Sequence, residues 1–398
     1  MRETMTGPER APAEVLRPGE FIGEELEARG WSQRDLAEIM GCSPRLVNEI
    51  IRGKRAITPE TARRLGAAFG TSAALWLNLE NAWRLRRLES NDEPVRRRAR
   101  LYGLAPVKEL IRRGWIRAAR DIDELESEIC RFYAIDRIDE EPAFLPHAAS
   151  KSAGLASLTA AQRAWLFRVK QLGAIVPAGE FSAEALQNAL DEIRSLLSDP
   201  EAPARVSDIL ARAGVRFLIV EHLAGTRIDG ACLWLDERRP VVALSLRYGR
   251  VDWFWHTLLH ELAHVKFRDG VQRSLLPDVD LVGLGAEPGE VRAGVERRAD
   301  RFASEFLLPR RAVKRFIEKT APYFSKEKIC EFAGRMGVHP GIVVGRLQYL
   351  EAIPYRQRRK MLVPVRDKVL ATALTDGWGR TVGPVGSDED TRAAPVRR

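Results

Sequence analysis

The chain has 398 residues, 45% of them apolar, which is too long for one ordinary core and fits about two or three globular domains. Apolar runs fall short of the roughly 18 to 20 residues that span a bilayer, and the N-terminal "MRETMTGPERAPAEVL" lacks a signal peptide's apolar segment, so we expect a cytoplasmic protein without membrane contact. The net charge of +9 favours a polyanionic partner such as nucleic acid. The four cysteines match no CxxC spacing, which argues against a disulfide framework and a cysteine zinc site.

Residues 30 to 80 are dense in signals that start and stop helices. Ser32 can cap a helix that ends before Gly41, and Ser43 can cap the next helix with Pro44 in its first turn. This spacing predicts a helix-turn-helix, in which the second helix reads DNA. We expect its outward-facing polar residues, at the front of that helix and just beyond it, to be Ser43, Arg45, Asn48, Arg52, Lys54 and Arg55.

The stretch "LAEIMGCSPRLVNEIIRGKRAITPETARRLGAAFGTSAALWLNLE" resembles the XRE-type helix-turn-helix of HigA-type antitoxins and related repressors. The resemblance implies an all-α bundle at residues 10–88 that binds palindromic double-stranded DNA as a homodimer. By position it assigns DNA contacts to Gln33, Ser43, Arg45 and Asn48. A helical bundle that binds only protein is the alternative.

A basic segment follows this domain. Residues 83–120 contain twelve Lys or Arg against four Asp or Glu, a net charge of +8. We interpret residues 89–145 as a basic helical linker, which is either a solvated face of connecting helices or a surface that follows DNA phosphates. Two prolines in "DEEPAFLPH", residues 139–147, predict a domain boundary there.

Beyond that boundary the pattern changes from helical to β-rich. Helices are predicted at 158–172, 183–197 and 203–213, followed by strands in "VRFLIVEHL", "GACLWLD" and "PVVALSLR". We therefore expect a multidomain chain whose second domain, residues 146–310, is of α+β type. The Gly, Pro, Asp and Arg content of residues 366–398 predicts a disordered tail.

The last of these strands leads into "HTLLHELAHVKF", which contains an HExxH pattern. On a helix His260 and His264 share one face, so their imidazoles can meet one ion, with Glu261 beside them to act on water. Downstream, Glu296 can complete a His2Glu zinc site, and Asp300 is placed to accept the second N–H of a ligand histidine. A buried histidine pair beside a salt-bridged surface helix is the alternative.

A second resemblance bears on this choice. "RIDGACLWLDERRPVVALSLRYGRVDWFWHTLLHELAHVKF", "ERRADRFASEFLLP" and "VHPGIVVGRLQ" are together similar to the ImmA/IrrE zinc peptidases. The resemblance implies a zincin-like fold, Zn²⁺ as cofactor, a C-terminal helical subdomain at 311–365 and cleavage of a regulatory protein. Its ligand positions fall on His260, His264 and Glu296, and its catalytic glutamate falls on Glu261.

Three further residues are weaker candidates for the same pocket. His256 lies one turn before His260 and is better suited to the pocket lip than to the metal. Tyr248 and Arg247 could stabilise an oxyanion, although they are also ordinary loop residues. "RIDGACL" could form an edge strand for an extended substrate.

The sequence therefore predicts a DNA-binding regulator with a zinc endopeptidase domain that cuts a repressor-like partner or itself in stress or toxin–antitoxin control. The rival hypothesis is a non-catalytic, HigA-like antitoxin or repressor whose zinc domain senses metal or binds a toxin. Intact metal ligands do not discriminate the two, since a sensor would keep them as well.

Overall fold

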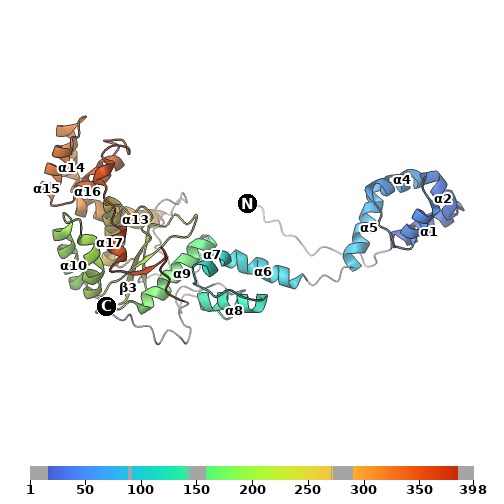
Figure 1. Cartoon of the computed structure of the whole chain (residues 1–398), viewed down its shortest axis with the longest axis horizontal. Helices are drawn as coiled ribbons and strands as arrows, with labels where there is room; N and C mark the ends of the chain where they lie inside the picture. The colour runs from blue at the N-terminus through green and yellow to red at the C-terminus, as the bar shows by residue number, and fades with distance from the viewer. Residues whose placement is uncertain are drawn as a thin grey trace. The chain divides into compact units, whose positions relative to one another are not determined.

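The computed structural model describes residues 17–87, 92–140, 142, 158–269, 271 and 290–383. The chain divides into two compact units, residues 1–93 and residues 94–398, which we name the N-terminal and the C-terminal unit (Figure 1). No described helix combines the length and the apolar character needed to cross a membrane. The predicted fold class, a helical N-terminal domain followed by an α+β domain, is confirmed.

The N-terminal unit is a bundle of helices. Their bounds are α1 Pro18–Arg29, α2 Gln33–Met40, α3 Pro44–Ile51, α4 Pro59–Phe69 and α5 Ala73–Arg87. The Ser32 hydroxyl accepts a hydrogen bond from the Asp35 N–H at the start of α2, and Gly41 ends that helix in the left-handed region, with φ of 60°. Ser43 caps α3 in the same way, with Pro44 in the first turn. These caps are why the chain reverses so sharply between α2 and α3.

The packing of α2 on α3 depends on a small apolar core. Leu36, Ala37, Val47 and Ile50 are all buried, next to the fully buried Trp76 of α5. Burying each large aliphatic side chain contributes about 1.5 to 3 kcal/mol. The apolar residues thus lock the two helices together and leave the polar side of α3 to solvent.

The C-terminal unit is built on a mixed four-stranded sheet. Its strands are β1 Arg216–Val220, β2 Gly230–Trp234, β3 Pro240–Leu244 and β4 Leu374–Asp376. The strand order is β2-β3-β1-β4, in which β2 pairs antiparallel with β3 and the other two pairs are parallel. The three strands predicted from apolar runs are confirmed, and β2 lies at an edge of the sheet as expected.

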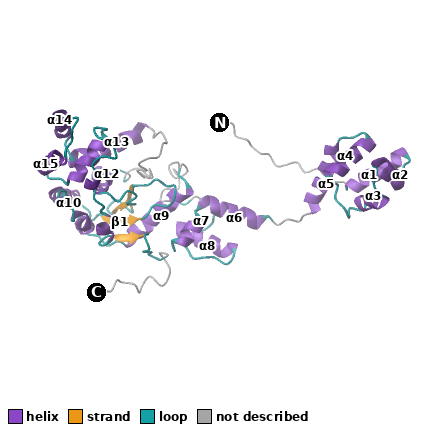
Figure 2. Ribbon diagram, turned by 45° about the horizontal axis from the view of Figure 1, so that its top comes forward, coloured by secondary structure: helices purple, strands orange, loops and turns teal. Residues whose placement is uncertain are grey.

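Helices cover both faces of this sheet (Figure 2). Along β3, Val242 and Leu244 enter one apolar core, while Val241 and Ala243 enter the other, because successive side chains of a strand point to opposite faces.

The remaining elements are α6 Glu93–Leu104, α7 Val107–Arg112, α8 Ile122–Tyr133, α9 Ala160–Ile175, α10 Ala183–Leu196, η2 Ala202–Arg205, α11 Val206–Arg212, α12 Val251–Phe267, α13 Glu290–Leu307, α14 Arg310–Thr320, α15 Lys326–Met336, α16 Pro340–Tyr349, η3 Arg359–Met361 and α17 Arg366–Leu370.

The interpretation of residues 89–145 as a linker is wrong for the helices α6 to α8. Leu101, Trp115 and Tyr133 are buried in the same apolar core as Trp165 of α9 and Leu218 of β1. These apolar positions lie close to arginines in the sequence, so the net charge of the segment concealed side chains that share an apolar core with α9 and β1. The domain boundary predicted at 139–147 is therefore wrong, because helices before and after it share one core.

The disordered tail predicted for residues 366–398 is wrong up to residue 383. Helix α17 and strand β4 lie in this range, and β4 pairs with β1 through Leu218 and Leu374. Asp376 is 1% exposed and accepts hydrogen bonds from Arg168 Nε at 2.7 Å and from Trp115 Nε1 at 3.1 Å. A buried ion pair of this kind tolerates loss of neither partner, which ties the C-terminal strand to α9 and to the segment after α7.

We expect Asp376→Ala to destabilise the C-terminal unit by about 3 to 5 kcal/mol, because the buried Arg168 guanidinium loses its carboxylate. Urea denaturation of the full chain measures this. Asp367→Ala, at an exposed position of α17, is the control and should change stability by less than about 0.5 kcal/mol. Equal stability of the two variants would contradict the structural role given to β4.

Candidate metal centre and recognition helix

Helix α12 carries the HExxH residues through the middle of the C-terminal unit. Most of its side chains are buried, because it packs against β2 and β3 on one side and against α13 and α16 on others. His260 and His264 are 2% and 0% exposed, and Glu261 is fully buried. Polar groups at such depth cost free energy unless they have partners.

Helix α13 brings those partners. Glu296 Oε2 lies 3.3 Å from His260 Nε2 and 3.6 Å from His264 Nε2, and the two Nε2 atoms lie 3.0 Å apart. Three ligand atoms of the types that zinc prefers therefore surround one point. In a tetrahedral zinc site with bonds of about 2.0 to 2.1 Å, such atoms are about 3.3 Å apart. The group formed by His260, His264 and Glu296 has the geometry to hold one metal ion.

Carboxylates on the far side of each imidazole fix its orientation. His260 Nδ1 lies 2.9 Å from Asp300 Oδ1, and His264 Nδ1 lies 3.1 Å from Asp269 Oδ2. A proton on Nδ1 that is donated to a carboxylate leaves the Nε2 lone pair directed at the metal position. These contacts favour, for both histidines, the neutral tautomer that a metal ligand needs once an ion displaces any further proton.

Asp269 was not predicted from the sequence. It comes just after α12, where Arg268 adopts a left-handed conformation with φ of 55° and turns the chain back beneath His264. Arg298 of α13 forms an ion pair with the other oxygen of the same carboxylate. A glycine usually marks a helix that ends in the left-handed conformation, and here an arginine takes that place, so the sequence did not predict the turn. The only available signal was an aspartate five residues after His264.

The charges of the group are strongly perturbed. Burial opposes a charged His264, but hydrogen bonds to Asp269 and Glu296 outweigh it and raise the pKa of His264 to about 10. Burial would likewise raise the pKa of Glu296, yet hydrogen bonds to both histidines hold that pKa well below its usual range. Without a metal, the group therefore keeps a proton on His264 at neutral pH.

The catalytic candidate Glu261 lies against the edge strand β2. A Cβ atom added at Gly230, the first residue of β2, would be 2.6 Å from Glu261 Oε1 and 3.0 Å from Thr257. Only glycine leaves room for the carboxylate between the strand and the helix. Gly230 was not predicted as a site residue, and in a strand a glycine often marks such a close approach.

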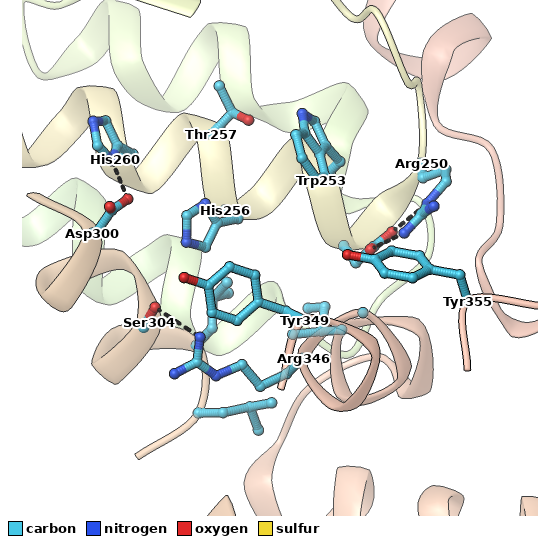
Figure 3. A pocket seen from close by; sticks show the side chains of 15 residues that line it. Arg250, Trp253, His256, Thr257, His260, Asp300, Ser304, Arg346, Tyr349 and Tyr355 are labelled. Atoms are coloured by element: carbon cyan, nitrogen blue, oxygen red, sulfur yellow. Dashed lines mark hydrogen bonds and ion pairs between the residues drawn. The ribbon is translucent and has the colours of Figure 1, made fainter. Parts of the chain in front are cut away.

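A cavity of about 260 Å³ lies beside the metal group, between α12, α13 and α16. His260 and Asp300 form one wall, and His256 lies next to them (Figure 3). Burial lowers the pKa of His256 to about 4, so this side chain is neutral. Other lining residues that the sequence did not suggest are Trp253, Ser304, Arg346, Tyr349 and Tyr355.

Tyr248 and Arg247 have other partners. Tyr248 is 48% exposed and lies against the Trp253 ring, with 4.5 Å between ring centroids. Arg247 forms an ion pair with the buried Asp229 at 2.9 Å. Neither residue lines the cavity beside His260, so their contacts do not favour the oxyanion role considered for them.

The predicted DNA contacts form the polar side of the helix-turn-helix. Asn48 Nδ2 of α3 donates to Gln33 Oε1 of α2 at 3.1 Å, which fixes two half-buried amides across the turn. The other five candidates are exposed: Ser43, Arg45, Arg52, Lys54 and Arg55.

One carboxylate lies among these cations. Glu49 accepts a hydrogen bond from Arg45 Nε at 2.9 Å and lies 3.6 Å from Arg55 Nη1. Arg45 is 88% exposed, so this pair is weak and easily exchanged for another anion. Glu49 holds both arginines over α3 in the unbound protein.

Family models match two parts of the chain. Residues 22–76 match the helix-turn-helix family. Residues 217–348 match the IrrE N-terminal-like domain of a peptidase family. The second range contains the metal group, Glu261 and all of α16 except its last residue, Tyr349.

Individual relatives cover about a fifth of the chain. The HTH-type transcriptional regulator YddM of Escherichia coli is 39% identical over 82 residues, which cover 21% of this chain and 87% of that protein. Virulence-associated protein I of Dichelobacter nodosus is 39% identical over 82 residues, covering 20% and 76%. A HigA-family addiction module antidote protein from Coxiella burnetii and the Pseudomonas aeruginosa antitoxin HigA with higBA promoter are similar solved structures, each 33% identical with a TM-score of 0.19, covering 20% of this chain and 88% of theirs.

Metal binding should release protons, because an ion at this point displaces the proton that His264 holds below its pKa of about 10. We expect about one zinc ion per chain and an apparent zinc affinity that rises roughly tenfold per pH unit between pH 7 and 9. Calorimetry in buffers of different ionisation enthalpy measures the number of protons released and the zinc affinity.

Asp269→Asn should release fewer protons and bind zinc about 10- to 100-fold more weakly. Unchanged metal content in Glu296→Ala would exclude Glu296 as a ligand.

Proposed function

Because the chain belongs to the helix-turn-helix family and carries an IrrE N-terminal-like peptidase-family domain, we propose that it is a DNA-binding transcriptional regulator with zinc-dependent endopeptidase activity. The convergence of His260, His264 and Glu296 beside the buried Glu261 carries this proposal. Two histidines and a glutamate, with a second glutamate next to them, are the residue types of a hydrolytic zinc site.

The proposed reaction is hydrolysis of a peptide bond. When bound, zinc supplies a Lewis acid that polarises the carbonyl and makes water a better nucleophile at neutral pH. Glu261 accepts the proton of the attacking water and delivers it to the amine nitrogen as the C–N bond breaks. Asp300 and Asp269 keep the two imidazoles oriented throughout.

An extended peptide fits beside Glu261 as an added strand. Among the described strands, β2 pairs only with β3, and its first residue lies against the Glu261 carboxylate. Backbone hydrogen bonds to a sheet edge give affinity without a strict sequence requirement. We propose that the substrate is a regulatory protein, either a repressor-like partner, a toxin or this chain itself, cut in response to stress or a toxin–antitoxin signal.

The N-terminal unit is the proposed DNA reader. Its exposed cations on α3 and just beyond it, together with the fixed Gln33–Asn48 pair, favour insertion of α3 into the major groove. Helix-turn-helix proteins commonly bind palindromic operators as dimers, so we propose a homodimer acting in the cytoplasm.

Helix α16 is not proposed as a second DNA reader, although α15 and α16 follow a similar helix-turn-helix spacing. Its residues Ile342, Gly345, Arg346 and Tyr349 line the cavity, and the helix packs on α12. The helical subdomain therefore contributes to the substrate site.

The variant Glu261→Gln distinguishes the endopeptidase hypothesis from the metal-sensor hypothesis. The amide has the same size and the three metal ligands remain, so the variant should bind zinc and fold as before. The general base is lost, and we expect cleavage to slow by about 10²- to 10⁴-fold. Cleaved species in cells under stress, followed by mass spectrometry, measure this for the wild-type chain and the variant side by side.

The rival hypothesis gives a different result. A metal sensor or toxin-binding repressor needs the ion and the surface, but no proton transfer. If Glu261→Gln complements a deletion strain as well as the wild type does, and no cleaved protein is found under stress, the endopeptidase is excluded.

Arg45→Ala should weaken binding to DNA from the chain's own promoter by about 1 to 3 kcal/mol, if Arg45 reads a base edge. Glu49→Gln should strengthen binding, because it releases Arg45 and Arg55 and removes a negative charge near the phosphates. Fluorescence anisotropy at one fixed salt concentration measures both variants. A fragment of residues 94–398, which keeps the C-terminal unit whole, would disprove this assignment if it bound as tightly as the full chain.

A further inference from the structure

Arg346 lies in the cavity beside the metal group. It projects from α16, and its Nη1 is 3.4 Å from the Ser304 hydroxyl of α13 (Figure 3). Ser304 lies one helical turn from Asp300, which itself holds His260. The guanidinium thus shares a 260 Å³ space with a metal ligand.

No carboxylate among the described residues forms an ion pair with Arg346. Its Nε is buried without a hydrogen-bond partner, and its guanidinium carbon lies 5.1 Å from the centroid of the Tyr349 ring. The nearby acids are engaged: Asp252 pairs with Arg250, Asp300 binds His260, and Glu305 accepts a hydrogen bond from the Arg310 backbone N–H. A half-buried guanidinium whose Nε lacks an acceptor is stabilised when a ligand supplies one.

Part of the remaining cavity wall is apolar and suits the aliphatic part of one side chain. Leu307, Leu308 and Ile342 line the cavity, and the exposed rings of Tyr349 and Tyr355 lie at its rim. The volume is just below the range of about 300 to 1,000 Å³ that small-ligand sites occupy. The space therefore fits one side chain or chain end, and not a folded partner.

We propose that Arg346 is a specificity-determining residue that binds a carboxylate of the substrate next to the cleaved bond. This inference rests on the proposed endopeptidase function. The carboxylate comes either from an Asp or Glu side chain or from a free C-terminus. The planar guanidinium can donate two parallel hydrogen bonds to its oxygens, which an amide of the same shape cannot accept as well.

The test uses the full-length, zinc-loaded chain and a random decapeptide library with acetylated and amidated ends. Mass spectrometry of the products should show Asp or Glu enriched about 10- to 100-fold at one position beside the cleaved bond. Arg346→Gln should abolish the enrichment while Arg346→Lys restores part of it. The matched control is Arg335→Gln on α15, which removes an exposed arginine that pairs with Glu331.

A second library with free C-termini distinguishes the two sources. If enrichment appears only near the free end and is absent from the amidated library, the terminal carboxylate is the ligand. Cleavage without any acidic or terminal preference, or the same preference in Arg346→Gln, would overturn the proposal.

A binding measurement keeps the proposal separate from the activity itself. Saturation-transfer NMR compares acetyl-glutamic acid methylamide with the acetyl-glutamine analogue on the full-length chain. The acid should bind at least about tenfold more tightly to the wild type, and the two should bind equally to Arg346→Gln. Loss of cleavage together with this result would reject the peptidase and retain the carboxylate site, whereas equal binding of both probes to the wild type would reject the site.

Discussion

Two imidazole nitrogens that face each other at 3.0 Å form the contact on which the candidate metal centre depends. Asp300 and Asp269 bind the far nitrogens, so both near nitrogens face the Glu296 carboxylate. Lone pairs cannot share such a space without a cation or a proton between them. Helix α13 supplies Glu296 and Asp300 to this pair, and hydrogen bonds to Asp269 and Glu296 give His264 its high pKa.

Those parts of the site that lie at helical spacing could be predicted from the sequence. His260 and His264 are one turn apart, as are Glu296 and Asp300, and periodicity alone brings each pair to one face. Asp269 and Gly230 could not be found in this way. The first depends on a left-handed turn at Arg268, and the second depends on the distance between a strand and a helix.

Predictions made from the average composition of a segment were wrong where single residues in that segment carry the fold. The arginines of residues 83–120 concealed the apolar positions Leu101 and Trp115, which pack with α9. A three-residue strand such as β4 has no period to detect, and its anchor, the pair of Arg168 with Asp376, joins positions 208 residues apart. Long-range pairing of this kind is visible only in three dimensions. Helices α2 and α3 were predictable because each begins at a serine that caps it.

The position of β4 also sets the order in which the chain can fold during synthesis. The N-terminal unit is complete by residue 87, whereas the sheet needs Asp376 to close around Arg168. At about 5 to 20 residues per second, a ribosome needs roughly 15 to 60 s to translate the intervening stretch. During that interval the DNA-reading bundle is already folded, while the sheet beneath α12 still lacks its last strand. The nascent chain therefore passes through a stage that has a complete helix-turn-helix but not yet a closed sheet beneath the candidate metal centre.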